Sequence, residues 1–162
     1  MGVLRRRWRV RVTANGYEIN LPAEERQLLI HLLPQLRELV AAPDDERSRR
    51  LFPTAYPDDP ERDAEYQRFT RSELATSRLA ALDRFMETAQ ARTVDEESLI
   101  GWMQSINSVR LVLGTLLDVG EDVDPSEVAA DDPAYSEFAL YGYLSGLLHE
   151  IVEALSGGGY GV

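Results

Sequence analysis

The stretch that decides the fold runs from Thr93 to Gly120 and reads TVDEESLIGWMQSINSVRLVLGTLLDVG. Large apolar residues recur in it at alternating steps of three and four: Leu99, Trp102, Ile106, Val109, Leu113 and Leu116. This spacing places their side chains on one face of an α-helix. Thr93 and Glu96 match a capping box, and Gly120 suits a left-handed helix end. We therefore predict a long central helix over residues 94–119.

A second stripe lies beside this apolar face and consists of Met103, Asn107, Arg110, Gly114 and Leu117. Asn107 and Arg110 are three residues apart and are therefore neighbours on a helix surface. Gly114 costs about 1 kcal/mol relative to alanine inside a helix, which indicates that another segment packs closely over it. Two interpretations stay open. Either a loop covers the stripe and Asn107 and Arg110 bind its backbone, or the stripe lines a groove for a ligand or peptide.

The composition limits the classes of protein to which the chain can belong. Its 162 residues, of which 44% are hydrophobic and 28% charged, are typical of one globular domain. There is no cysteine, and all 17 basic residues are arginine, which excludes thiol catalysis, disulfides and lysine Schiff bases. The net charge of −11 argues against broad nucleic-acid binding. No apolar run is long enough for a membrane span and no secretory signal is present, so we expect a cytoplasmic protein.

A β-hairpin is predicted over residues 4–21. Asn15-Gly16 is a strong signal for a two-residue turn, which would pair Val12 with Ile19 and Val10 with Leu21. The apolar face would then contain Trp8, Val10, Val12, Ile19 and Leu21. The opposite face would carry Arg5, Arg7, Arg9 and Arg11, which form the basic cluster of the chain. These arginines could contact phosphates of nucleic acid, or they could form a solvated face paired with acidic residues.

Three further helices are predicted, over residues 22–42, 61–91 and 133–155. Pro34 should kink or split the first of them, because proline lacks an amide donor. Thr70 and Glu73 match another capping box, which predicts a bend or restart within the second. The fold class is thus mainly α, with an N-terminal β-hairpin followed by a bundle of four to five helices. We assign residues 1–155 to a single domain and residues 156–162 to a flexible glycine-rich tail.

The proline-rich segment between residues 42 and 60 contains Arg50-Leu51-Phe52-Pro53-Thr54-Ala55-Tyr56. A hydrophobic stretch between acidic flanks must either pack on the domain or bind a partner. We expect it to lie over Gly114, with Phe52 and Tyr56 as anchors. The candidate binding residues are therefore Arg50, Phe52, Tyr56, Asn107 and Arg110. A buried arginine with planar donors at this place suits a peptide carbonyl or a C-terminal carboxylate.

No motif for catalysis, a cofactor or a metal ion is found in the sequence. It contains no nucleophile elbow, no glycine-rich phosphate loop and no paired histidine ligands, and its two histidines, His31 and His149, are far apart. The acidic loop at residues 121–132 lacks the glycine that a calcium-binding loop requires. We therefore expect neither enzymatic activity nor a cofactor or metal site.

Several segments resemble a known family: Arg50-Leu51-Phe52-Pro53, Ala55-Tyr56, Glu65-Tyr66, Trp102, Asn107, Arg110-Leu111, Leu113-Gly114 and Leu117. The chain resembles the actinobacterial DUF2017 proteins from about Trp8 to Leu155. This resemblance implies a cytoplasmic bacterial protein without assigned catalytic residues. Genes of the family often lie near that of the ClpS adaptor, which implies a link to Clp-type regulated proteolysis. Some members carry a transcriptional-regulator label.

The sequence thus favours a non-catalytic protein-interaction or regulatory module with a protein partner. One alternative is a transcription-type regulator that contacts DNA through Arg5, Arg7, Arg9 and Arg11. Another is a small-ligand sensor with a pocket beside Gly114. The apolar faces of residues 61–91 and 133–155 could close one bundle, or one of them could face a second copy in a homodimer.

Overall fold

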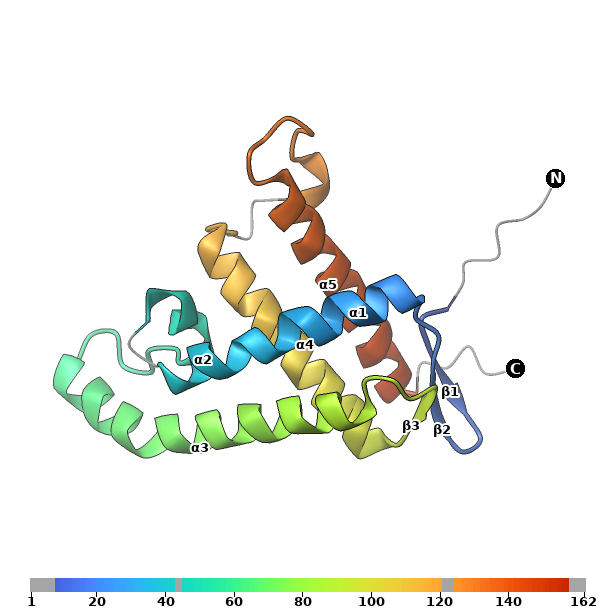
Figure 1. Ribbon diagram of the computed structural model, residues 1–162. Coiled ribbons are helices and arrows are strands. Elements are labelled where there is room, and N and C mark those ends of the chain that lie inside the picture. The colour runs from blue at the N-terminus through green and yellow to red at the C-terminus, as the bar shows by residue number, and fades with distance from the viewer. Residues whose placement is uncertain (1–7, 43–44, 121–123, 158–162) are drawn as a thin grey trace.

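The computed structural model describes residues 8–42, 45–120 and 124–157. Two strands come first, followed by a sequence of helices that a short third strand interrupts (Figure 1). The strands are β1 (Val10–Thr13), β2 (Gly16–Ile19) and β3 (Thr93–Val94). The α-helices are α1 (Ala23–Leu32), α2 (Leu36–Ala41), α3 (Pro60–Thr88), α4 (Glu96–Leu116) and α5 (Tyr135–Leu155). Short 3-10 helices are η1 (Leu33–Gln35), η2 (Glu46–Leu51) and η3 (Pro125–Glu127). The fold is mainly α, as the sequence predicts.

Helix α4 is the centre of the bundle and packs against α3, α5 and η2 (Figure 1). Of its predicted apolar face, Leu99, Trp102, Ile106, Val109 and Leu113 are buried. Leu116, the last residue of the helix, is 58% exposed. Trp102 packs edge-on against Phe85 of α3 with ring centroids 4.7 Å apart, and its Nε1 donates to Thr88 Oγ1 at 2.8 Å. These contacts join α4 to α3, the longest helix of the described chain.

Both predicted ends of the central helix are wrong. Thr93 does not cap the helix, because Thr93 and Val94 pair with Glu18 and Tyr17 as the third strand of the sheet. The cap is Asp95, whose Oδ1 accepts from the amide of Ser98 at 2.8 Å. At the other end, Asp118 takes the left-handed conformation with a φ of 50°, so Gly120 is not the stop.

The hairpin exists, but its register differs from the prediction. Val10 pairs with Ile19, Val12 with Tyr17 and Thr13 with Gly16, so the two-residue turn is Ala14-Asn15. Gly16 is needed within the strand, because it has a φ of +137° and a Cβ there would lie 2.6 Å from the carbonyl oxygen of Val94. Val10, Ile19 and Leu21 are buried as expected. Trp8 and Val12 are not, being 42% and 45% exposed.

The outer helices follow the prediction in part. Pro34 interrupts the first helix, since the 3-10 turn η1 separates α1 from α2. The sequence predicts a bend or a restart at Thr70, and the restart does not occur, because α3 continues through this residue. The hydroxyl of Thr70 instead donates to the carbonyl of Tyr66 at 2.9 Å, within the same helix. Helix α5 begins at Tyr135, two residues later than predicted, and it ends at Leu155, as predicted.

No helix in the described part of the chain is both long enough and apolar enough to cross a membrane. Of the predicted tail, residues 158–162 lie outside the described residues.

Candidate functional site

The segment from Arg50 to Tyr56 packs on the domain through its first half. Leu51 is completely buried and Phe52 is 5% exposed, and η2 contacts α4. The segment does meet Gly114, but through Arg50: a Cβ on Gly114 would lie 2.7 Å from Arg50 Nη1. Phe52 anchors the segment in the hydrophobic core, but neither Phe52 nor Tyr56 is among the nearest neighbours of this glycine. The segment thus approaches Gly114 through the long side chain of Arg50 and not through its backbone.

The backbone of this segment is held by polar side chains of α3. Arg78 Nη2 donates to the carbonyl oxygen of Leu51 at 2.7 Å, and Gln67 Nε2 donates to that of Pro53 at 2.9 Å. Asp63 Oδ1 accepts from the amides of Ala55 and Tyr56 at 2.8 and 3.1 Å. Asn107 and Arg110 form no hydrogen bond with the segment in the described structure. Asn107 and Arg110 therefore do not hold the segment, in contrast to Asp63, Gln67 and Arg78.

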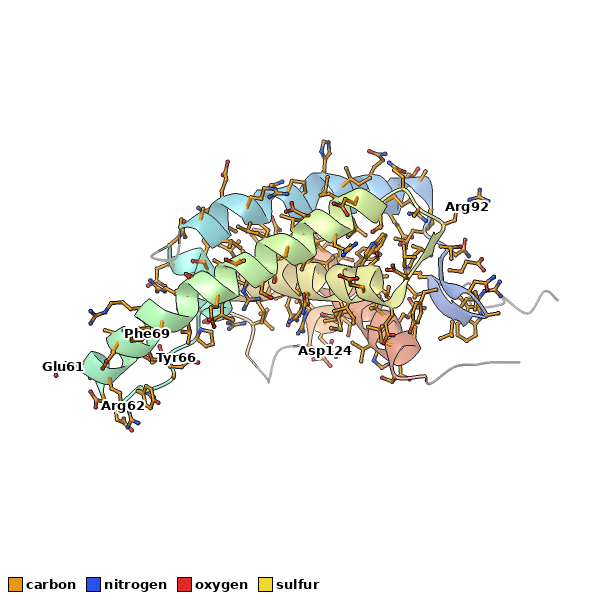
Figure 2. The ribbon with its side chains drawn as sticks, turned by 90° about the horizontal axis from the view of Figure 1, so that it is seen from below. Glu61, Arg62, Tyr66, Phe69, Arg92 and Asp124 are labelled. Atoms are coloured by element: carbon orange, nitrogen blue, oxygen red, sulfur yellow. The ribbon has the colours of Figure 1, made fainter. Side chains whose placement is uncertain are left out.

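Tyr56 lies apart from the other candidate residues, at the N-terminal end of α3. Its ring packs edge-on against Tyr66 with centroids 5.8 Å apart, and the guanidinium carbon of Arg62 lies 4.3 Å from its centroid. Figure 2 shows Arg62, Tyr66 and Phe69 together at this projecting end of the helix. Phe52 is also not a surface residue, because it belongs to the hydrophobic core.

Arg110 forms a compact polar cluster with residues of two helices. Its Nη2 donates to Asn107 Oδ1 at 3.0 Å, and its Nη1 donates to the hydroxyl of Tyr141 at 3.4 Å. The ring of Tyr141 also passes 3.4 Å from where a Cβ of Gly114 would be, beside Arg50. Tyr141 on α5 therefore lies next to both arginines. We call Arg50, Asn107, Arg110 and Tyr141 the Arg110 cluster.

Tyr141 is not among the candidate binding residues that the sequence predicts. Its spacing with the apolar residues of α5 indicates a packing position, and it does pack against the core. Its hydroxyl group was the signal for a second role, since a tyrosine in a partly buried position usually directs its hydroxyl to a polar partner. Which partner that is depends on how α4 and α5 meet, which the sequence of α5 does not state.

The Arg110 cluster carries positive charge without a matching carboxylate. Arg50 donates to the carbonyl oxygen of Val119 at 3.0 Å, and both partners of Arg110 are neutral oxygens. Within residues 8–42, 45–120 and 124–157, neither arginine forms an ion pair, although the chain as a whole has a net charge of −11. Arg110 is half-buried, and its Nε has no hydrogen-bond partner there. The cluster can therefore donate hydrogen bonds to the oxygen atoms of a carboxylate or a carbonyl group.

Arg78 provides a contrast on the neighbouring face of α4. Its Nη1 donates to Ser108 Oγ at 3.1 Å and its Nη2 to Leu51, so it connects α3, α4 and η2. Burial lowers the pKa of its guanidinium group. Because its contacts all lie within the bundle, Arg78 is a structural residue.

The N-terminal arginines are partly engaged by carboxylates. Arg9 bonds to Glu25 at 3.3 Å and to Glu150 at 3.5 Å, and Arg11 donates twice to Glu18, at 3.1 and 2.7 Å. Arg5 and Arg7 lie outside the described residues. A phosphate that approached Arg9 or Arg11 would have to compete with these carboxylates.

No group of three or more histidine, aspartate or glutamate residues that could hold a metal ion occurs in the part of the chain that the structure describes. His31 and His149 are both exposed and lie on different helices, α1 and α5.

A family model described as a domain of unknown function, DUF2017, matches residues 5–155. The chain therefore belongs to the DUF2017 family. The match extends over the hairpin, the helices α1 to α5 of the described chain and every residue of the Arg110 cluster. No curated protein and no solved structure matches the chain significantly.

Proposed function

We propose that this protein is a non-catalytic interaction module that binds a segment of a protein partner at the Arg110 cluster. The observation that carries this proposal is the half-buried guanidinium group of Arg110, whose partners, Asn107 and Tyr141, are both neutral. A planar guanidinium group favours an oxygen pair such as a carboxylate, with which it can form two parallel hydrogen bonds. The partner segment would therefore present a C-terminal carboxylate, an acidic side chain or backbone carbonyls.

The arrangement of the neighbouring side chains supports this assignment. Asn107 and Tyr141 each accept a hydrogen bond from one terminal nitrogen of Arg110, and the guanidinium carbon lies 5.8 Å from the centroid of the Tyr141 ring. Such fixing lowers the entropy lost when a ligand binds. Arg50 adds a second positive charge near Tyr141, since both side chains approach Gly114.

The resemblance to the family adds an expectation about the partner. A link to Clp-type regulated proteolysis would make the partner a component or a substrate of that machinery in the cytoplasm. The chemical groups that the Arg110 cluster can bind are the same with or without this link.

The test compares the wild-type protein with three variants in pull-downs from lysate of the native host, read by mass spectrometry. Arg110→Ala removes the guanidinium group, and Arg110→Lys keeps the charge without the planar fork. Arg68→Ala is the matched control, because Arg68 is an exposed arginine on α3. We expect a partner that wild type and Arg68→Ala capture, that Arg110→Lys captures weakly and that Arg110→Ala does not capture.

The thermal stability of each variant is measured alongside. The proposal requires that Arg110→Ala remains folded but no longer captures the partner. The binding measurement is then repeated with the purified partner. It would be wrong if Arg110→Ala captured the same proteins as wild type. It would also be wrong if the variant lost much stability and still captured its partner, because the cluster would then be structural.

DNA binding through Arg5, Arg7, Arg9 and Arg11 remains an alternative prediction with less support. Arg9 and Arg11 already bind carboxylates, and these contacts reduce the charge that is available to phosphates. The alternative requires binding to DNA that weakens steeply with salt and is lost when all four arginines are replaced by alanine.

A further inference from the structure

A hollow of about 710 Å³ lies at the end of the molecule that carries the sheet. It is bounded by the end of β2, the first turn of α1 and the connection between α3 and β3. Its polar lining residues are Glu18, Asn20, Arg26, Gln90, Arg92 and Thr93. Its volume is in the range of pockets that bind small molecules, about 300–1,000 Å³.

Arg26 is held firmly at the wall of this hollow. Its Nη1 donates to the carbonyl oxygen of Ala89 at 2.8 Å, and its Nη2 donates to that of Ile19 at 2.9 Å. These two bonds fix the guanidinium group between the end of α3 and the end of β2. Both acceptors are neutral, so the positive charge of Arg26 is not cancelled by them.

Arg92 supplies a second positive charge to the same hollow. Its side chain is exposed and forms no hydrogen bond or ion pair with the residues that the structure describes. Figure 2 places Arg92 at the hairpin end of the molecule. The pKa of Arg26 is lowered, first by burial and then by the charge of Arg92, so the two cations repel each other across this region.

The acidic residue that lines the hollow is already engaged. The carboxylate of Glu18 accepts two hydrogen bonds from Arg11, at 3.1 and 2.7 Å. The remaining polar lining residues, Asn20, Gln90 and Thr93, are neutral donors or acceptors. A cationic hollow of this kind contrasts with a chain whose net charge is −11.

We propose that this hollow binds a small metabolite with oxyanion groups, whose phosphoryl or carboxylate oxygens lie between Arg26 and Arg92. Guanidinium groups bind both kinds of oxyanion through charge-assisted hydrogen bonds. Such a ligand would relieve the repulsion between the two arginines. It would also connect β2, α1 and the end of α3, and so stabilise the folded protein.

This site is separate from the Arg110 cluster. The hollow adjoins the residues before α4, whereas Arg110 lies 14 residues after Glu96, about 21 Å along the helix. A ligand in the hollow would therefore leave the Arg110 cluster open to a protein partner.

The experiment follows thermal unfolding of the full chain with pyrophosphate or citrate, at constant ionic strength. Wild type is compared with Arg92→Gln and with Arg68→Gln, which makes the same charge change at an exposed position of α3. We expect a saturable rise in melting temperature for wild type and Arg68→Gln. The affinity of Arg92→Gln should be at least tenfold weaker. Chemical shifts of the side-chain amides of Asn20 and Gln90 should change at the same ligand concentrations.

The two ligands distinguish the chemical source. A response to pyrophosphate alone indicates a phosphorylated ligand, and a response to citrate alone indicates a polycarboxylate; either result supports the oxyanion site. The proposal is overturned if neither anion gives a saturable shift. It is also overturned if all three proteins respond equally, because the shift would then be a general salt effect.

Discussion

Arg78 donates a hydrogen bond from Nη2 to the backbone carbonyl oxygen of Leu51 at 2.7 Å, across 27 residues of sequence. Leu51 is completely buried, so its carbonyl group depends on this bond. The contact fastens η2 to α3, while the bond from Arg78 to Ser108 fastens the same side chain to α4. Three elements that are separate in the sequence thus share one guanidinium group.

Replacing Arg78 should therefore destabilise the fold. Arg78→Ala leaves the Leu51 carbonyl without its donor, and we expect a loss of about 2 kcal/mol in the free energy of unfolding. Urea denaturation measures this change. The control, Arg68→Ala, alters an exposed arginine ten residues earlier and should change stability by less than about 0.5 kcal/mol. Equal values for the two variants would show that the Leu51 contact does not stabilise the protein.

Gly16 is expected to tolerate no side chain. Its φ of +137° strains any other residue, and a Cβ would lie 2.6 Å from the carbonyl oxygen of Val94. Gly16→Ala should cost about 2 kcal/mol or more in unfolding free energy, since backbone strain alone costs about 1–3 kcal/mol. Gly146→Ala is the control, because nothing lies within 4 Å of its Cβ position in the middle of α5. That variant should gain up to about 1 kcal/mol from helix propensity.

Gly114 differs from Gly16 because its close neighbour is a flexible side chain. Gly114→Ala gains helix propensity but displaces Arg50 Nη1, which lies 2.7 Å from the new Cβ. The gain of about 1 kcal/mol and the loss of the bond to Val119, about 0.5–1.5 kcal/mol, should nearly cancel. In an Arg50→Ala background the same substitution should be stabilising. A double-mutant cycle measures this coupling, and purely additive effects would contradict it.

Asp95 should make the stability of the protein depend on acid pH. Hydrogen bonds from Ser98 lower the pKa of its carboxyl group in the folded state. The stabilisation is therefore complete above the unfolded pKa of about 3.9, and it is lost as the pH falls through the lower folded pKa. Asp95→Ala should be less stable than wild type at pH 7, and the difference should shrink below about pH 4.

Denaturant unfolding at several pH values tests this expectation. Asp58→Ala serves as the comparison, because Asp58 is an exposed aspartate in the loop before α3. Its difference from wild type should remain small at every pH. A difference for Asp95→Ala that stayed constant from pH 7 to acid conditions would show that the charge of the cap is not responsible.

Much of the fold follows from local sequence patterns. The three-and-four spacing from Leu99 to Leu113 identified the central helix, because a helix that packs on several neighbours needs a continuous apolar face. Pro34 identified the interruption between α1 and α2, because proline lacks the amide donor that the helix requires. Gly114 indicated a close approach by another segment, and the segment that contains Arg50 provides it.

The sequence alone determined which segments would form the α-helices, that a hairpin would precede them and that another segment would approach Gly114. Only the tertiary structure decided the hairpin register, because β3 is more than 70 residues away and its contact with Gly16 overrides the local turn preference. It likewise decided that Arg78, and not Asn107 or Arg110, holds the covering segment, and that Tyr141 lies beside Arg110. The spacing of apolar residues shows which face of a helix is buried, because residues about one turn apart share a face. The partner that a long polar side chain reaches depends on how distant elements pack, and no local pattern records this.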